Sequence, residues 1–158
     1  FLTLELTGWK GRAGSALASD PATEAWARTI IPAAAQANRL DMRMLAQNGV
    51  PIAMLINFLT PPGGFSFKTA YAEDLARFSP GVLLQQVNLD LLGRADLKWI
   101  DSCAAPGHPM IDSIWRERRT LVWINAAIGG RAQRLKYAAL TRAEAAWRRL
   151  RPAAEQPA

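Results

Sequence analysis

Three titratable side chains have the type and position to carry a proton transfer. His108 is the only histidine of the 158 residues and lies in a loop rich in proline and glycine, where an imidazole suits general-base catalysis. Glu73 follows one predicted strand, and Asp101 lies at the end of another. Each also has a structural alternative: a helix cap for His108, a solvated turn for Glu73 and an anchor of the next loop for Asp101. The residue types indicate catalytic candidates and leave their roles open.

The tripeptide Ser79-Pro80-Gly81 predicts the start of a helix whose first turn could hold an anion. Unpaired main-chain N–H groups and the helix dipole favour a phosphate at such a position. Gly81 allows the backbone to approach a phosphate closely, and Arg77, just upstream, adds a positive charge. Pro80 removes one N–H donor, which makes the cradle thinner. A plain helix cap is the alternative.

The motifs that the sequence lacks, together with its cysteine count and its short apolar runs, exclude several classes of protein. The sequence has no P-loop, no dinucleotide-binding glycine pattern, no Gly-x-Ser-x-Gly elbow and no metal-ligand spacing. The single cysteine, Cys103, excludes an internal disulfide framework and is typical of a cytoplasmic protein. No apolar run approaches the ~20 residues of a membrane span. Because the chain begins with Phe1, we expect the C-terminal part of a longer protein, either dimeric or packed against a missing N-terminal half.

The positive charge is concentrated near the C-terminus. The whole chain carries a formal charge of +6. Residues 116–151 hold ten Lys/Arg against two acids, whereas the remainder holds nine Lys/Arg against eleven acids. A basic segment of this kind could contact nucleic acid or an anionic surface. A solvated helical face is the simpler interpretation, and we favour it.

The N-terminal third is predicted to be helical. Residues 1–6 form a short amphipathic helix, followed by a glycine-rich basic loop at 8–14. The sequence Ser19-Asp20-Pro21 predicts a strong helix start. Pro32 should bend this helix or end it early. Its expected buried stripe consists of Trp26, Ile30, Ile31 and Ala35.

The middle of the chain predicts three antiparallel strands. Alternation of apolar and polar residues over 40–46 indicates the first strand, and Asn48-Gly49 is a strong hairpin signal because both turn positions need positive φ. A second strand covers 50–59. After the turn at 61–64, a third covers 65–71. Tight turns between consecutive strands predict an antiparallel meander.

The remainder predicts alternating helices and strands. A helix from Ser79 to about residue 92 should face inward with Val82, Leu83, Val87 and Leu91. A strand at 97–102, a short helix at 107–115 and a strand at 120–128 follow. An amphipathic helix over 131–151, with the stripe Leu135, Leu140, Trp147 and Leu150, and a disordered tail at 152–158 complete the chain. The fold class is α+β, with one domain over 1–151.

Three segments resemble the GNAT acyltransferases associated with cellulose biosynthesis (CelD-like), which are related to FemAB-type transferases. They are LTGWKGRAGSAL at 6–17, YAEDLARFSPGVLL at 71–84 and WIDSCAAPGHPMID at 99–112. The predicted order of elements also matches the GNAT core. The resemblance covers about residues 1–122.

The resemblance implies acetyl-CoA, or another acyl-CoA, as co-substrate. In a GNAT fold, the strand around Asn57 and Phe58 would hydrogen-bond the pantetheine, splayed from the strand at 97–102. The helix start with Ser79, Gly81, Val82 and Leu83, together with Arg77, would bind the pyrophosphate. Asp101 is the acid that the resemblance marks most clearly. The segment around Trp9, Lys10 and Arg12 would close over the acceptor or the phosphates, or be an ordinary surface loop.

Three hypotheses about function follow. The first is an acyl-CoA-dependent N- or O-acyltransferase whose amine or hydroxyl acceptor belongs to exopolysaccharide or cell-envelope biosynthesis. The second is a FemAB-like aminoacyl transferase that uses charged tRNA. The basic tail supports it, but residues 110–115 lack the lysine usual in FemAB-related proteins. The third is a catalytically inert binding or scaffold module of GNAT fold.

Overall fold

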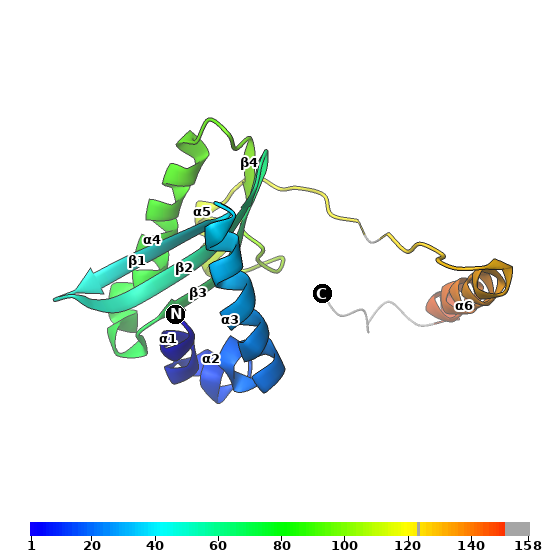
Figure 1. Cartoon of the computed structure of the whole chain (residues 1–158), viewed down its shortest axis with the longest axis horizontal. Coiled ribbons are helices and arrows are strands. Elements are labelled where there is room, and N and C mark those ends of the chain that lie inside the picture. Colours follow the sequence, from blue (N-terminus) through cyan, green and yellow to red (C-terminus); the bar gives the residue numbers. More distant parts are fainter. Residues whose placement is uncertain (123, 151–158) are drawn as a thin grey trace. The chain divides into compact units, whose positions relative to one another are not determined.

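The computed structural model describes residues 1–122 and 124–150, which belong to two compact units, 1–117 and 118–158. The first unit contains a four-stranded sheet with helices on both faces (Figure 1). The described part of the second unit contains one helix. A single domain over 1–151 stays a prediction, and the expected tail at 152–158 lies outside the described residues.

The helices and strands have the following bounds. They are α1 (Leu2–Thr7), α2 (Trp9–Arg12), the 3-10 helix η1 (Leu17–Ser19), α3 (Pro21–Gln36), β1 (Leu40–Gln47), β2 (Val50–Thr60), β3 (Gly63–Tyr71), the 3-10 helix η2 (Glu73–Phe78), α4 (Pro80–Asn88), the 3-10 helix η3 (Leu89–Gly93), β4 (Trp99–Asp101), α5 (Pro109–Ile114) and α6 (Arg131–Leu150).

The sheet confirms the predicted meander. Its strand order is β1-β2-β3-β4, with the first three strands antiparallel and β4 parallel to β3. The hairpin between β1 and β2 turns at Asn48 and Gly49, whose φ angles of 51° and 77° are those the sequence predicts for this turn. The α+β architecture is therefore that of the predicted fold class.

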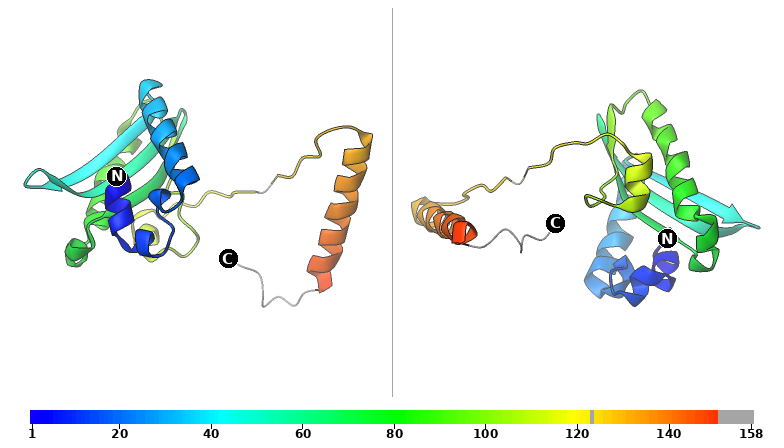
Figure 2. Two further views of the ribbon diagram at one scale, coloured as in Figure 1. Left: turned by 60° about the horizontal axis from the view of Figure 1, so that its bottom comes forward. Right: turned by 180° about the vertical axis from the view of Figure 1, so that it is seen from behind.

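Each face of the sheet is covered by different helices (Figure 2). On one face, Leu84 of α4 packs on Ala53 and Leu55 of β2, and all three side chains are fully buried. On the other face lie α1 and α3, and the ring of Trp26 packs edge-on against Phe67 at 5.8 Å between centroids. Apolar residues are thus buried on both faces: one cluster lies between α4 and the meander, and Ile56 and Ala27 are fully buried on the α3 side.

A β-bulge in β3 directs two consecutive side chains toward the same face of the sheet, which α1 and α3 cover. Ile56 pairs with Lys68 and Asn57 with Ser66, so Phe67 is the extra residue of β3. Phe67 contacts α3, and Lys68 reaches Glu5 of α1 at 2.9 Å. Without the bulge, the alternation of strand side chains would point one of the two to the α4 face.

A buried polar network joins three strands to α4. The amide of Asn57 donates to Asn88 Oδ1 at 2.9 Å and to Asp41 Oδ1 at 3.1 Å, and its carbonyl accepts from Ser66 Oγ at 2.7 Å. Asn88 closes the ring by donating to Ser66 Oγ at 2.9 Å. Asn57 and Asn88 are fully buried, and satisfied buried networks of this kind fix one register.

One prediction for the N-terminal helices is wrong, and another is decided in part. The expected loop at 8–14 contains the helical turn α2. Helix α3 does not end early at Pro32 but continues to Gln36, while a bend at Pro32 stays a prediction. Pro32 is exposed, so the carbonyl it leaves unpaired four residues earlier can be hydrated. The expected stripe is also only partly covered, since Trp26 is 46% and Ile30 36% exposed, while Ala27 is the fully buried residue of α3. The Asp20 cap is confirmed, because its carboxylate accepts from the N–H groups of residues 22 and 23.

The second half of the chain brings further corrections. The α-helix α4 ends at Asn88 and continues as the 3-10 helix η3. Leu83 and Val87 are exposed, contrary to prediction. The buried face of α4 instead mixes polar and apolar residues at the helical spacing i, i+3, i+4 and i+7, which are Gly81, Leu84, Gln85 and Asn88. Residues 120–122 and 124–128 form no strand. In α6, the predicted stripe residues Leu135, Leu140 and Trp147 are more than half exposed, and the side chain of the fourth, Leu150, is not among those described.

We predict that Asn57→Leu lowers the free energy of unfolding by about 3 kcal/mol, because the buried hydroxyl hydrogen of Ser66 loses its acceptor and the buried Oδ1 of Asn88 loses its donor. Urea denaturation measures this change. The matched control is Gln86→Leu, the same kind of substitution at an exposed position of α4, which should cost less than about 0.5 kcal/mol. Equal effects of the two substitutions would contradict the role assigned to the network.

Candidate active site

A buried carboxylate attaches the N-terminal helices to β3. The side chain of Glu5 is fully buried; one oxygen accepts from Lys68 Nζ at 2.9 Å and the other from the main-chain N–H of Leu17 at 2.8 Å. Lys10 Nζ lies 3.6 Å from the first oxygen. Lys68 also donates to the carbonyl of Ser15. One negative charge thus holds two ammonium groups, which leaves a net positive charge beside β3.

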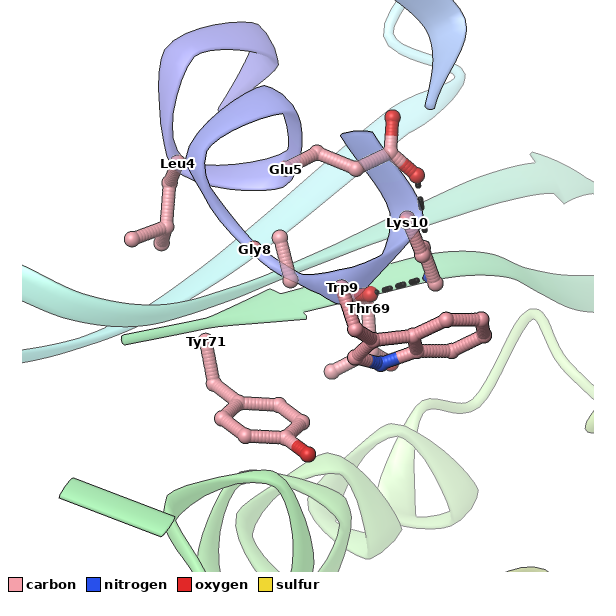
Figure 3. Close-up of a pocket in the computed structure, with 8 residues that line it drawn as sticks. Leu4, Glu5, Gly8, Trp9, Lys10, Thr69 and Tyr71 are labelled. Carbon is pink, nitrogen blue, oxygen red and sulfur yellow. Dashed lines mark hydrogen bonds and ion pairs between the residues drawn. The ribbon is translucent and has the colours of Figure 1, made fainter. Parts of the chain in front are cut away.

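Lys10 binds the backbone of β3 directly. Its ammonium donates to the carbonyl of Thr69 at 2.7 Å (Figure 3). Burial lowers the pKa of Lys10 below its ordinary value; the charge of Glu5 opposes this shift, and that of Lys68 adds to it. Lys10 is therefore easier to deprotonate than a surface lysine.

The edge of β3 that faces β4 is open over most of its length. β3 and β4 pair only from Gly63/Trp99 to Phe65/Asp101. The N–H of Ala72 bonds to Ile52 on the β2 side, so by strand alternation Tyr71 and Thr69 direct their main-chain groups to the opposite, open side. The carbonyl of Thr69 already accepts from Lys10, in agreement with that direction.

A shallow pocket lies along the C-terminal half of β3. It forms between the turn of α1 and α2 and the end of the strand, and it has room for about one water molecule. Figure 3 shows the indole of Trp9 and the ring of Tyr71 on the same side of it. Its lining consists of Leu4, Glu5, Gly8, Trp9, Lys10, Thr69, Ala70 and Tyr71. We call it the β3-edge pocket.

Glu73 fastens the rim of this pocket. Its carboxylate accepts from the main-chain N–H of Trp9 and from Arg12 Nη2, the latter at 2.6 Å. The hydrogen bond from Arg12 lowers the pKa of Glu73, and the bond from Trp9 acts in the same direction. Such a carboxylate takes up a proton less readily than a free one, so this geometry suits positioning of the N-terminal segment better than general-base catalysis.

The predicted phosphate cradle at α4 has few free donors. Ser79 adopts the left-handed conformation (φ 51°), and its carbonyl accepts from the N–H groups of both Val82 and Leu83. Since Pro80 has no N–H, Gly81 retains the one donor of the first turn that these bonds do not use. Gly81 is buried, and a Cβ there would lie 3.5 Å from the ring of Tyr71.

The remaining predicted binding residues lie in three different places. Arg77 is exposed, with its guanidinium over the ring of Phe78 at 4.6 Å. The side chain of Asn57 is enclosed in the network with Ser66 and Asn88. Phe58 packs on Phe67 on the opposite face, next to α3. The segment 71–83 therefore gathers Arg77, Ser79, Gly81, Val82 and Leu83, while Asn57 and Phe58 belong to an inner strand paired on both sides.

Asp101 and His108 both make hydrogen bonds to main-chain N–H groups in the loop that leads to α5. The carboxylate of Asp101 accepts from the N–H of Cys103 at 2.8 Å, and Cys103 has a positive φ of 54°. His108 caps α5, its Nδ1 accepting from the N–H of Ile111 at 3.4 Å. Although Cys103 as a residue is exposed, burial of its thiol, together with the charge of Asp101, raises the pKa of Cys103 to about 11. Its thiol is therefore protonated at neutral pH.

Gln85 is a site residue that the sequence reasoning missed. It is 2% exposed, donates to Thr69 Oγ1 at 3.3 Å and accepts from Trp115 Nε1 at 3.2 Å. It thereby joins the strand at the β3-edge pocket to α4 and to the end of α5. Its spacing of four residues from Gly81 and three from Asn88, on one helix face, was the available signal.

The chain belongs to the acetyltransferase (GNAT) domain family. The model of this family matches residues 1–108, from α1 through β4 to His108. No curated protein sequence matches the chain. Within the part of the chain that the structure describes, no three His, Cys, Asp or Glu residues could hold a metal ion, and no helix could cross a membrane.

We predict that Glu5→Gln lowers the free energy of unfolding by about 3 kcal/mol, because it leaves two ammonium groups around a neutral amide. The control is Glu24→Gln, which breaks an exposed i,i+4 ion pair with Arg28 and should cost less than about 0.5 kcal/mol. Thermal and urea unfolding measure both. Similar values for the two variants would show that Glu5 does not hold the N-terminal helices.

We predict that Glu73→Ala accelerates tryptic cleavage after Arg12 several-fold at neutral pH, because α2 loses both of its hydrogen bonds to the carboxylate of Glu73. Asp74→Ala, an exposed neighbour, is the control and should leave the rate unchanged.

The same contact has a defined pH dependence. The pKa of Glu73 is lowered by folding, so its stabilising effect is present above the ordinary value of 4.5 and is lost as the pH falls through the lower folded value. The amide resonance of Trp9 should therefore titrate below pH 4.5. A Trp9 resonance that titrates only above this pH would contradict the assignment.

Proposed function

We propose that this protein is an acyl-CoA-dependent N- or O-acyltransferase that transfers an acyl group, most simply acetyl, to an amine or hydroxyl. Membership of the acetyltransferase (GNAT) domain family supports this function. The observation that carries it is the open edge of β3, which extends from the last pair with β4 to Tyr71, whose ring lies beside Gly81 in the first turn of α4. An extended pantetheine arm can bond to such an edge in the manner of an added strand.

The reaction requires few contributions from side chains. The acceptor nitrogen or oxygen attacks the thioester carbonyl carbon, the carbon–sulfur bond breaks, CoA leaves as its thiolate or thiol, and the acceptor loses a proton. Orientation, a positive charge near the developing oxyanion and a route for the proton are sufficient. The ammonium of Lys10 at the β3 edge fits the second requirement. Asp101 and His108 stay candidates for the third, and the engaged carboxylate of Glu73 suits it less.

The acceptor is proposed from the resemblance to CelD-like proteins. That resemblance favours a sugar or amine of exopolysaccharide, cellulose or cell-envelope biosynthesis. The exposed indole of Trp9 beside the ring of Tyr71 supports such an acceptor, because aromatic faces provide flat apolar surface for a sugar ring. Since acyl-CoA and a single unpaired cysteine both suit the cytoplasm, we propose that compartment.

We predict that the protein binds acetyl-CoA and that Leu83→Asp weakens this binding by at least about tenfold, because a carboxylate in the first turn of α4 repels phosphate and competes for the dipole. Leu83 is 48% exposed, so the substitution leaves the core intact. Gln86→Asp, one turn further along, is the control and should change the affinity less than about twofold. Isothermal titration calorimetry measures all three.

Failure of folded wild-type protein to bind acetyl-CoA or CoA would overturn the proposal for this chain. Salt-dependent binding of aminoacyl-tRNA would then favour the FemAB-like transferase, and binding of neither donor would favour an inert scaffold module. Equal losses in the two Asp variants would show that the start of α4 is not the phosphate site.

A further inference from the structure

Helix α6 combines an apolar arc with a cluster of arginines and is drawn in orange to red in Figure 1. At 100° per residue, Leu135, Leu140 and Trp147 fall within an arc of about 140°. The alanines at 139, 143 and 146 fill the same arc. Leu135 is 72% and Leu140 70% exposed. The helix therefore presents apolar surface over most of its length.

The arginines of α6 lie along one border of this arc. Arg131, Arg142 and Arg149 are 11 and 7 residues apart, which places them within about 20° of one another and about 20–40° from Leu135. Arg134 lies further round on the polar side, and Lys136 lies inside the apolar arc, where its long stem can extend to the polar layer. Glu144 is the one acidic residue among the side chains of α6 that the structure describes.

We propose that α6 binds the surface of an anionic lipid bilayer, lying in the plane of the interface. An apolar face with leucine and tryptophan beside a row of arginines matches the acyl chains and the anionic headgroups together. A nucleic acid would engage the arginines and leave Leu135 and Leu140 in water. A second copy of α6 would cover the leucines but bring rows of like charge together.

The geometry of α6 fits an in-plane orientation. Twenty residues give a helix about 30 Å long, and the arginine row runs parallel to its axis. All three arginines can therefore reach headgroups while Leu135 and Leu140 enter the acyl layer on the same side. Such binding would bring the acyltransferase unit to a membrane surface, but the inference rests on α6 alone and not on the proposed activity.

Vesicle flotation with the full chain tests the proposal. The probes are vesicles of phosphatidylglycerol and phosphatidylcholine in equal amounts, and vesicles of phosphatidylcholine alone, at physiological salt. We expect flotation with the anionic vesicles only, reduced by added salt. Leu135→Gln/Leu140→Gln should weaken binding at least about tenfold, and Arg131→Gln/Arg142→Gln/Arg149→Gln about a hundredfold.

Matched controls carry the same changes on the other unit. Val50→Gln/Leu92→Gln removes exposed apolar side chains there, and Arg28→Gln/Arg39→Gln/Arg94→Gln removes exposed positive charges; both should bind as the wild type does. Circular dichroism verifies that each variant is folded.

Three results would overturn the proposal. They are no flotation of the wild type, equal loss in the control variants, and unchanged binding by the leucine variant. The last result, together with competition by duplex DNA or RNA, would assign the helix to a nucleic acid. Sedimentation of the wild type as a dimer that the leucine variant disrupts, without vesicle binding, would assign it to a second copy.

Discussion

The burial of Glu5 is the constraint on which the candidate site depends. A fully buried carboxylate is unfavourable unless charge and hydrogen bonds compensate it, and here Lys68 and the N–H of Leu17 do so from two separate segments. The attraction between Glu5 and Lys68 fixes α1 on β3. Because Lys10 follows five residues after Glu5, the same attachment brings its ammonium to the backbone of Thr69. The β3-edge pocket exists because these helices are held there.

The β-bulge makes this attachment compatible with the rest of the fold. It lets one strand serve α3 through Phe67 and α1 through Lys68, while Ser66 and Thr69 still face α4. Asn57 and Asn88 lock the register on that other face through their bonds to Ser66. If the pairing of β3 with β2 shifted by one residue, Lys68 would point to the α4 face. The same shift would break the hydrogen bonds among Asn57, Ser66 and Asn88. Polar contacts thus determine the register that the small apolar core cannot specify by itself.

Local signals made the meander and the main helix starts predictable, whereas the polar core was not. Asn48-Gly49 and Asp20-Pro21 determine their own backbone geometry, so the sequence predicts them correctly. Of the residues predicted to face inward, Leu91 is buried, but Leu83 and Val87 are exposed. Gln85 and Asn88 were missed because they are less apolar than Leu83 and Val87. Their burial depends on partners 16 and 22 residues away in the chain, Thr69 and Ser66. No local pattern shows that such partners exist. The candidate phosphate-binding residues between 71 and 83 were predictable as neighbours because they are close together in the chain. The hydrogen bonds from the N–H groups of Val82 and Leu83 to the carbonyl of Ser79 were not predictable.

The positions of charge along β3 limit how one reaction centre can be built. Asp101 is paired with Phe65, and Lys10 binds Thr69, four residues further along the strand. Because Phe67 is a bulge residue, β2 covers the same span in the three residues from Phe58 to Leu55. At ~3.3 Å per residue these points are about 10 Å apart, which is too far for both groups to contact the same acyl carbon. If the thioester carbonyl lies near Thr69, Lys10 is placed to stabilise its oxyanion. If it lies near Phe65, Asp101 is within reach of the acceptor, and Lys10 contacts the donor further along its length. The first arrangement agrees better with the structure, because Asp101 already holds Cys103 in a left-handed turn and Lys10 already faces the pocket.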